Sequence, residues 1–175
     1  MATALPPKQN LRRLRIAILL LIVFAPAGVF AQPSQAVTLH VTGEVPKPLE
    51  LGAADLAALP HQTIRVTDEK GTEVEYNGVP VAEILAKAGA ALGEQMKGPN
   101  LALGVVASAP DGYRVLFSLT EFDPAFSDRV IILADRRDGK ALDSHEGPLR
   151  FVVPGDKRHA RWIRGVTTME VVRVH

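Results

Sequence analysis

Short apolar runs separated by turn-forming residues are the feature that most restricts the fold of this chain. Residues 37–45 alternate apolar and polar side chains, which is the period-two pattern of a half-buried strand. Residues 61–78 and 101–123 each contain two such runs around a Gly-containing turn, at 69–71 and at 110–112. Both segments are predicted to be β-hairpins, because Gly supplies the positive φ that tight turns need.

The rest of the chain adds strands and little helix. Three further apolar runs, at 129–134, 148–153 and 167–174, are predicted strands. Residues 80–89 carry apolar side chains at helical spacing between an opening Pro and a closing Gly, which predicts a helix. A shorter helical turn is expected at 51–60. Roughly seven strands with one or two short helices favour an α+β fold with a mixed or antiparallel sheet.

Residues 1–31 have the order of a secretory signal peptide, with a basic start, an apolar run and small residues that end at Ala31. The apolar run is interrupted by Pro26 and Gly28 and is too short to span a bilayer well. We therefore expect cleavage after Ala31, a periplasmic or secreted protein without a membrane span after signal removal, and one mature domain at 32–175. A retained N-terminal anchor is the alternative.

Charge is distributed unevenly along the predicted mature chain. It holds 16 basic and 19 acidic residues, a net charge of −3, whereas residues 144–165 alone hold five basic and two acidic residues. We call this stretch the basic segment. An acidic domain with one basic segment indicates a focused anion site and not a nucleic-acid-binding protein. The few aromatic residues are also not interleaved with basic ones, as binding of single-stranded nucleic acids would require.

The sequence contains no Cys. A domain of this length has room for a proper core, so its stability is expected to come from packing without disulfides. The absence of Cys also excludes thiolate catalysis and thiolate ligation of a soft metal by the protein.

Other chemically active residue types lack the arrangement that catalysis or metal binding needs. Ser144, His145 and Glu146 are adjacent, and neighbours in an extended chain point to opposite faces, so we interpret them as a polar loop. The histidines show no metal-binding spacing; they are His40, His61, His145, His159 and His175. The paired carboxylates, interpreted as solvated charges, are Asp68/Glu69, Glu73/Glu75 and Asp135/Asp138.

The basic segment is the strongest remaining candidate for a binding site. Residues 154–156 break a predicted strand, so Lys157, Arg158 and His159 are expected to project from a loop. Arg side chains bind phosphate oxygens through two parallel hydrogen bonds, and loop N–H groups add donors. An anion site and a solvated charged loop both fit this pattern.

Three short motifs occur along the chain in a characteristic order. They are Gly78-Val79-Pro80, Gly147-Pro148-Leu149-Arg150 and Val153-Pro154-Gly155. With the runs between them, they make residues 40–175 resemble the molybdopterin-binding domain of the sulfite oxidase family. The resemblance implies a mixed α+β fold in which loops and basic side chains hold the pterin and the phosphate of the cofactor. The resemblance also implies which residues contact the cofactor. They are Arg150, Lys157, Arg158, His159 and Arg161.

One departure from the family decides what the resemblance implies for function. Catalytic members ligate molybdenum with a Cys thiolate in a loop before the Gly78-Val79-Pro80 position, whereas residues 65–80 here are short and hold no Cys. Sulfite oxidase activity is therefore not expected, and no catalytic residue or protein metal ligand is assigned.

The function that follows is a non-catalytic binding module for a pterin, another small anion or a periplasmic protein partner. Its cofactor would be molybdopterin without Cys ligation, or none. The first alternative is an active molybdenum-dependent oxidoreductase with non-Cys metal ligation. A second alternative is a sensor or scaffold domain that docks to a membrane or to an enzyme.

Overall fold

The computed structural model describes Met1, residues 38–68 and residues 70–174. Except for Met1, the predicted signal segment 1–31 lies outside the described residues, and so do Glu69 and His175. Within the described part, no helix is long and apolar enough to cross a membrane.

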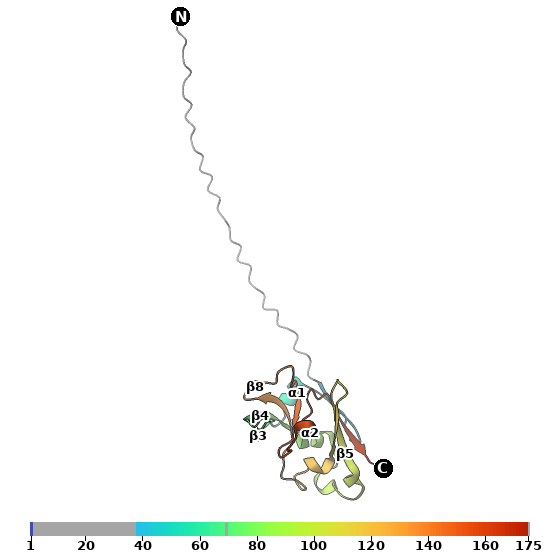
Figure 1. Ribbon diagram of the computed structural model, residues 1–175. Coiled ribbons are helices and arrows are strands. Elements are labelled where there is room, and N and C mark those ends of the chain that lie inside the picture. Colours follow the sequence, from blue (N-terminus) through green and yellow to red (C-terminus); the bar gives the residue numbers. More distant parts are fainter. Residues whose placement is uncertain (2–37, 69, 175) are drawn as a thin grey trace. The chain divides into compact units, whose positions relative to one another are not determined.

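Sheet A contains the only parallel strand pair among the described strands. Its strand order is β2-β1-β10-β5-β6, and the red arrow of β10 lies beside β5 in Figure 1. Strands β1 and β10 run parallel, and every other neighbouring pair in the sheet is antiparallel. The strands are β1 (Thr38–Gly43), β2 (Leu49–Gly52), β5 (Leu103–Ser108), β6 (Arg114–Ser118) and β10 (Thr168–Arg173).

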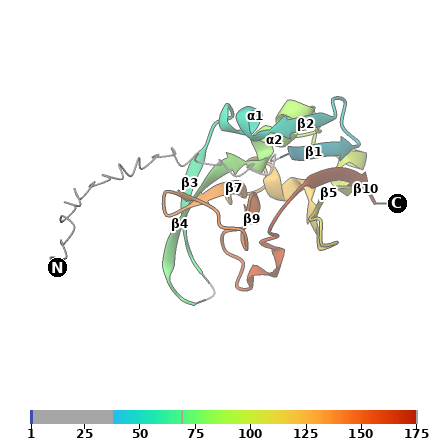
Figure 2. The same ribbon diagram turned by 90° about the horizontal axis from the view of Figure 1, so that it is seen from above.

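Sheet B is antiparallel and carries the elements that form the candidate site. Its order is β3-β4-β7-β8, and β9 pairs with β7 as well. Figure 2 shows the long β3–β4 hairpin projecting beyond the other strands. The strands are β3 (Gln62–Thr67), β4 (Glu73–Pro80), β7 (Ile132–Arg137), β8 (Lys140–Ala141) and β9 (Arg150–Val152).

Within residues 38–174, apart from position 69, two short α-helices and four 3₁₀ turns connect the strands. Helix α2 begins after Pro80, buries its apolar face and ends at Gly89, whose φ of 78° is the left-handed conformation of a helix C-terminus. The elements are α1 (Ala53–Ala57), α2 (Val81–Ala88), η1 (Gly93–Gln95), η2 (Gly98–Ala102), η3 (Leu119–Phe122) and η4 (His159–Arg161).

The predicted α+β class with a mixed sheet is confirmed, and the strands divide between two sheets. Both predicted hairpins form, as β3–β4 and β5–β6. The predicted strand at 129–134 begins later, at Ile132, and continues to Arg137 because β8 folds back against its end. Strands β2 and β8 were not predicted, since runs of four and two residues show no periodicity.

A single apolar core joins the two sheets. Phe117 of β6 lies with its ring centroid 5.4 Å from that of Phe151 of β9, so residues of sheets A and B are in direct contact. Phe122 completes this aromatic group at 5.5 Å from Phe117. Rings at such separations and tilted angles pack favourably, in addition to the apolar area that they bury.

Gly78 allows β4 and β7 to approach closely. The register of this pair shifts between Asn77 and Gly78, which is a bulge in the ladder. A Cβ atom at position 78 would lie 2.2 Å from the carbonyl oxygen of Leu133 and 2.4 Å from Cα of Ala134. Since both contacts are with backbone, only Gly fits here.

We expect Gly78→Ala to lower the free energy of unfolding by at least about 3 kcal/mol, because neither strand can move without breaking the ladder. The control is Gly71→Ala in the β3–β4 turn, where the space is open and φ is +80°. That change should cost only about 1–2 kcal/mol, the strain of a left-handed Ala. Urea unfolding of both variants measures the difference, and equal losses would contradict a steric role for Gly78.

Candidate functional site

The basic segment does not form one continuous basic surface. Arg150 lies in β9 and points inward, where its residue is only 5% exposed. Lys157, Arg158 and Arg164 are exposed, whereas His159 and Arg161 are half-buried in η4. Trp162 is buried and donates its indole N–H to the carbonyl of Val153 at 3.0 Å, which anchors the segment to the core.

Arg150 is a buried cation with three kinds of contact. Its Nη1 donates to Oε1 of Glu146 and, at 3.2 Å, to the hydroxyl of Tyr76. Its guanidinium carbon lies 5.5 Å from the ring centroids of both Tyr76 and Trp162, within the range of a cation–π interaction. Its Nε is buried and has no hydrogen-bond partner among the described residues.

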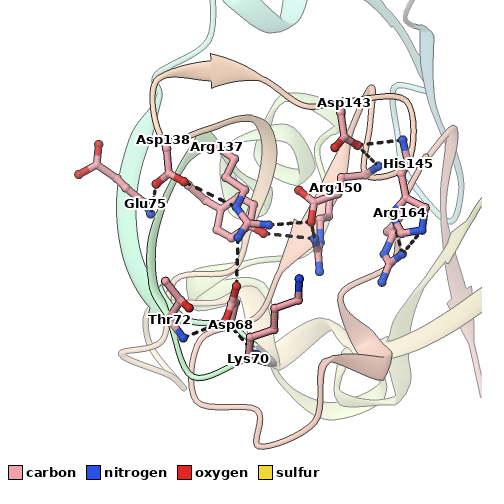
Figure 3. A network of polar contacts seen from close by, with 12 residues as sticks. Asp68, Lys70, Thr72, Glu75, Arg137, Asp138, Asp143, His145, Arg150 and Arg164 are labelled. Atoms are coloured by element: carbon pink, nitrogen blue, oxygen red, sulfur yellow. Dashed lines mark hydrogen bonds and ion pairs between the residues drawn. The ribbon is translucent and has the colours of Figure 1, made fainter.

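Arg137, at the end of β7, extends the network to the β3–β4 hairpin. Its Nη1 donates to the same Oε1 of Glu146 at 3.0 Å, and its Nη2 donates to Asp68 at 3.1 Å (Figure 3). We call Asp68, Tyr76, Arg137, Glu146 and Arg150 the arginine cluster. It joins β4, β7, β9 and two loops through side chains alone.

The cluster changes the acidity of its own members. The N–H of Thr72 and, to a smaller extent, the N–H of Lys70 and the side chain of Arg137 lower the pKa of Asp68, although burial opposes them. Burial raises the pKa of the Tyr76 phenol, with the charge of Arg150 acting in the opposite direction. Burial acts to lower the pKa of Arg137, but nearby Tyr76, Glu146 and Asp68 outweigh it and the pKa is raised. Arg137 therefore stays charged and Tyr76 stays protonated at neutral pH.

A pocket of about 310 Å³ opens beside the arginine cluster. Figure 3 shows the Lys70 side chain pointing from the hairpin turn toward Arg150. His159 also faces this pocket and stacks on Trp162, with ring centroids 3.7 Å apart. The pocket is lined by four Lys or Arg residues, two acidic residues, two histidines and one tyrosine. In sequence order they are Asp68, Lys70, Tyr76, Arg137, His145, Glu146, Arg150, His159 and Arg164.

The pocket unites some of the residues that the sequence suggested and not others. Arg150 and His159 line it together. Lys157 lines a neighbouring pocket of about 590 Å³, which His159 and Trp162 also border, so the two pockets are adjacent. Arg158 is exposed on the same loop. Whether these residues contact a ligand stays a prediction.

Arg161 points to another part of the molecule. Its guanidinium forms two hydrogen bonds with Asp156, at 2.8 and 2.9 Å, and a third with Glu121 at 2.9 Å. It also lies 5.1 Å from the ring centroid of Phe117. The hydrogen bond with Asp156, and that with Glu121, raise the pKa of Arg161. These contacts tie η4 to η3, so its charge is balanced by two carboxylates.

Sequence reasoning missed most of the arginine cluster. Glu146 was assigned to a polar loop, and Asp68 to a solvated carboxylate pair, yet their side chains are only 14% and 15% exposed. The available signal was the tyrosine in the second arm of the hairpin, since a buried Tyr needs a polar partner. The hydrogen-bond partner of its hydroxyl, Arg150, lies 74 residues further on in sequence.

The residues of the pocket fit an anion better than a metal ion. Its volume is at the lower end of the range for small-ligand sites, about 300–1,000 Å³. The unpaired Nε of buried Arg150 and the excess of basic residues favour a phosphate or another oxyanion. No group of three or more His, Cys, Asp or Glu side chains that could hold a metal occurs among the described residues.

We expect Asp68→Asn to reveal a pH-dependent contribution to stability. Because folding lowers the pKa of Asp68, its stabilisation is complete above the usual carboxyl value of 3.8 and is lost as pH falls through the lowered pKa. The variant should be less stable than the wild type at pH 7 and should approach it below about pH 4. Urea unfolding at several pH values measures this, with Asp128→Asn at an exposed carboxylate as control; a gap that does not depend on pH would contradict it.

Comparison with known proteins agrees with the architecture. The chain is similar to the crystal structure of the sulfane dehydrogenase SoxCD from Paracoccus pantotrophus, with a TM-score of 0.60 and 24% sequence identity. The match covers 77% of this chain and 37% of the other, so this chain spans little more than a third of that chain's length. At this identity the likeness shows the fold. The comparison with curated proteins gives no match.

A family model settles the family. The model described as the oxidoreductase molybdopterin binding domain matches residues 27–174, which is most of the chain. The resemblance seen in the sequence motifs is thereby confirmed, and the chain belongs to the oxidoreductase molybdopterin-binding domain family.

Proposed function

We propose that this domain is an exported, non-catalytic module that binds a pterin or another phosphate-bearing small anion. The observation that carries the proposal is Arg150, a buried guanidinium with an unpaired Nε at the edge of a basic pocket. A buried cation with an unsatisfied donor favours an additional acceptor, and a ligand oxygen is such an acceptor.

Several residues of the pocket suit the two parts of a pterin phosphate. Lys70, Arg150 and Arg164 would hold the phosphate, since their donors match its oxygens. The stacked pair of His159 and Trp162 offers a flat side chain at the edge of the pocket, on which a planar ring packs well. Lys157 and Arg158 would extend the contacts along the loop.

The proposed lack of catalysis follows from the ligand chemistry. When bound, a molybdenum-loaded cofactor supplies redox chemistry. In the catalytic members of the family that the chain resembles, the protein ligand of the molybdenum is a Cys thiolate. The sequence has no Cys, and the hairpin turn in the corresponding region is closed by hydrogen bonds to the carboxylate of Asp68 from the N–H groups of Lys70 and Thr72. A site of this kind would hold the organic part of the cofactor without a sulfur anchor for the metal.

Export and a protein partner are parts of the same proposal. The signal-like segment 1–31 supports a periplasmic or secreted location. Because the matched sulfane dehydrogenase chain is much longer than this one, its activity is not carried over; a periplasmic protein partner would supply what a single small domain lacks.

The test of the function is native mass spectrometry with molybdenum analysis on one sample, purified from the exported fraction of cofactor-replete cells. We expect a bound pterin mass and no stoichiometric molybdenum. Arg164→Ala should reduce the bound fraction at least about tenfold, as expected for one charged hydrogen bond, while Arg136→Ala, at an exposed neighbour of the cluster, should not. Stoichiometric molybdenum would support the active-enzyme alternative, and absence of both groups would overturn pterin binding.

Two further variants separate ligand contacts from structural ion pairs. Arg150→Lys keeps the charge but removes the planar fork, so we expect weaker pterin retention. Arg161→Ala removes the ion pairs with Asp156 and Glu121 and should cost on the order of 1 kcal/mol of stability without loss of the ligand. Loss of the ligand in Arg161→Ala, measured on the same purified samples, would instead make Arg161 a contact.

A further inference from the structure

A single carboxylate oxygen lies between the two arginines of the cluster. Oε1 of Glu146 accepts hydrogen bonds from Nη1 of Arg137, at 3.0 Å, and from Nη1 of Arg150. Two guanidinium groups that converge on one oxygen are the arrangement with which proteins bind phosphate or carboxylate ligands. Here the oxygen belongs to the chain itself.

The loop that carries Glu146 is held in place by Asp143. The carboxylate of Asp143 accepts the N–H of Glu146 and the N–H of His145, both at 2.9 Å. The N–H of Gly147 bonds to the carbonyl oxygen of Asp143 at 2.8 Å. The N–H groups of Glu146 and His145 lower the pKa of Asp143, so this turn is fixed at neutral pH. Glu146 is thus presented to the arginines by a preformed turn.

The two arginines depend on Glu146 to different degrees. Arg137 has two other carboxylate partners, Asp68 at 3.1 Å and Asp138 at 3.7 Å. For Arg150, Glu146 is the one carboxylate in contact within residues 38–68 and 70–174. Removal of Glu146 would leave Arg150 buried with the hydroxyl of Tyr76 as its remaining hydrogen-bond partner, and this is costly for a desolvated cation.

We propose that Glu146 is an internal occupant of the anion position and that an oxyanion ligand must displace it to reach Arg137 and Arg150. The ligand class is a phosphate monoester or free inorganic phosphate, since its oxygens match both guanidinium groups while Lys70 and Arg164 balance the remaining charge. This inference deepens the proposed function and rests on the same pocket. Ligand affinity of the wild type is then reduced by competition with a carboxylate that is always present.

The test uses Glu146→Gln, which keeps the size of the side chain and removes its charge. Inorganic phosphate is titrated into the purified full chain by calorimetry, at constant ionic strength set with chloride. We expect the Kd for phosphate to fall at least about tenfold relative to the wild type, because a neutral amide competes less strongly than a carboxylate for the two guanidinium groups. The variant should also melt at a lower temperature, and phosphate should restore its melting temperature.

Glu121→Gln is the matched control. Oε2 of Glu121 also accepts from two arginines, Arg129 at 3.2 Å and Arg161 at 2.9 Å, but both keep Asp156 as a partner. Its phosphate affinity and its response of melting temperature to phosphate should equal those of the wild type. An equal gain in Glu121→Gln would show a general charge effect and would overturn the assignment to Glu146.

Glu146→Asp covers the case in which Glu146→Gln does not fold. It keeps the charge but is one methylene shorter, so it cannot reach both arginines, and an intermediate phosphate affinity is expected. Phosphate affinity unchanged in every Glu146 variant that folds would overturn the inference. If these variants gain phosphate affinity while the wild type retains no pterin, pterin binding is overturned and the inference about Glu146 stands. If the wild type retains pterin but the Glu146 variants do not gain phosphate affinity, the inference is overturned and pterin binding stands.

Discussion

The desolvation of the Arg150 guanidinium is the constraint to which the neighbouring structure conforms. A charge removed from water must gain equivalent contacts within the protein, or the folded state loses several kcal/mol. Glu146 supplies the opposite charge, and Tyr76 and Trp162 supply ring faces and a hydroxyl. These partners come from a loop, from β4 and from the end of the basic segment, so one buried cation fixes the relative position of three separate pieces of chain.

The basic residues of one segment serve different purposes because their counter-ions differ. Arg161 is balanced by Asp156 and Glu121, and this pairing links η4 to η3. Arg150 is turned into the arginine cluster, whereas the exposed Lys157 and Arg158 keep their charge in solvent. Of the five basic residues of the segment, Arg150 and Arg164 line the pocket beside the arginine cluster, and Lys70 and Arg137 join them there from other parts of the chain.

The family fold persists here together with a hairpin turn that has its own internal support. The carboxylate of Asp68 accepts hydrogen bonds from two backbone N–H groups of the turn and from the side chain of Arg137. This one carboxylate therefore closes the turn and also ties it to β7. Gly78 lets the following strand pack closely on β7 and brings Tyr76 into the cluster. Packing and ion pairs between these residues therefore maintain the scaffold of the pocket.

The sequence by itself determined the family and most of the elements, because both depend on local order. Period-two runs predicted the β3–β4 and β5–β6 hairpins, Pro80 and Gly89 bounded α2, and the order of Gly78-Val79-Pro80 and the Gly147–Arg150 stretch identified the molybdopterin-binding domain. The division into two sheets, and the parallel pairing of β1 with β10 from opposite ends of residues 38–174, were decided by the tertiary structure. The tertiary structure also decided which charges meet: Glu146 reads as a loop residue and Asp68 as a turn residue until β4, β7 and β9 bring Arg137 and Arg150 against them. Ion pairing depends on distance in space, and Asp68 and Arg137, which are 69 positions apart in sequence, come together only after the sheets have formed.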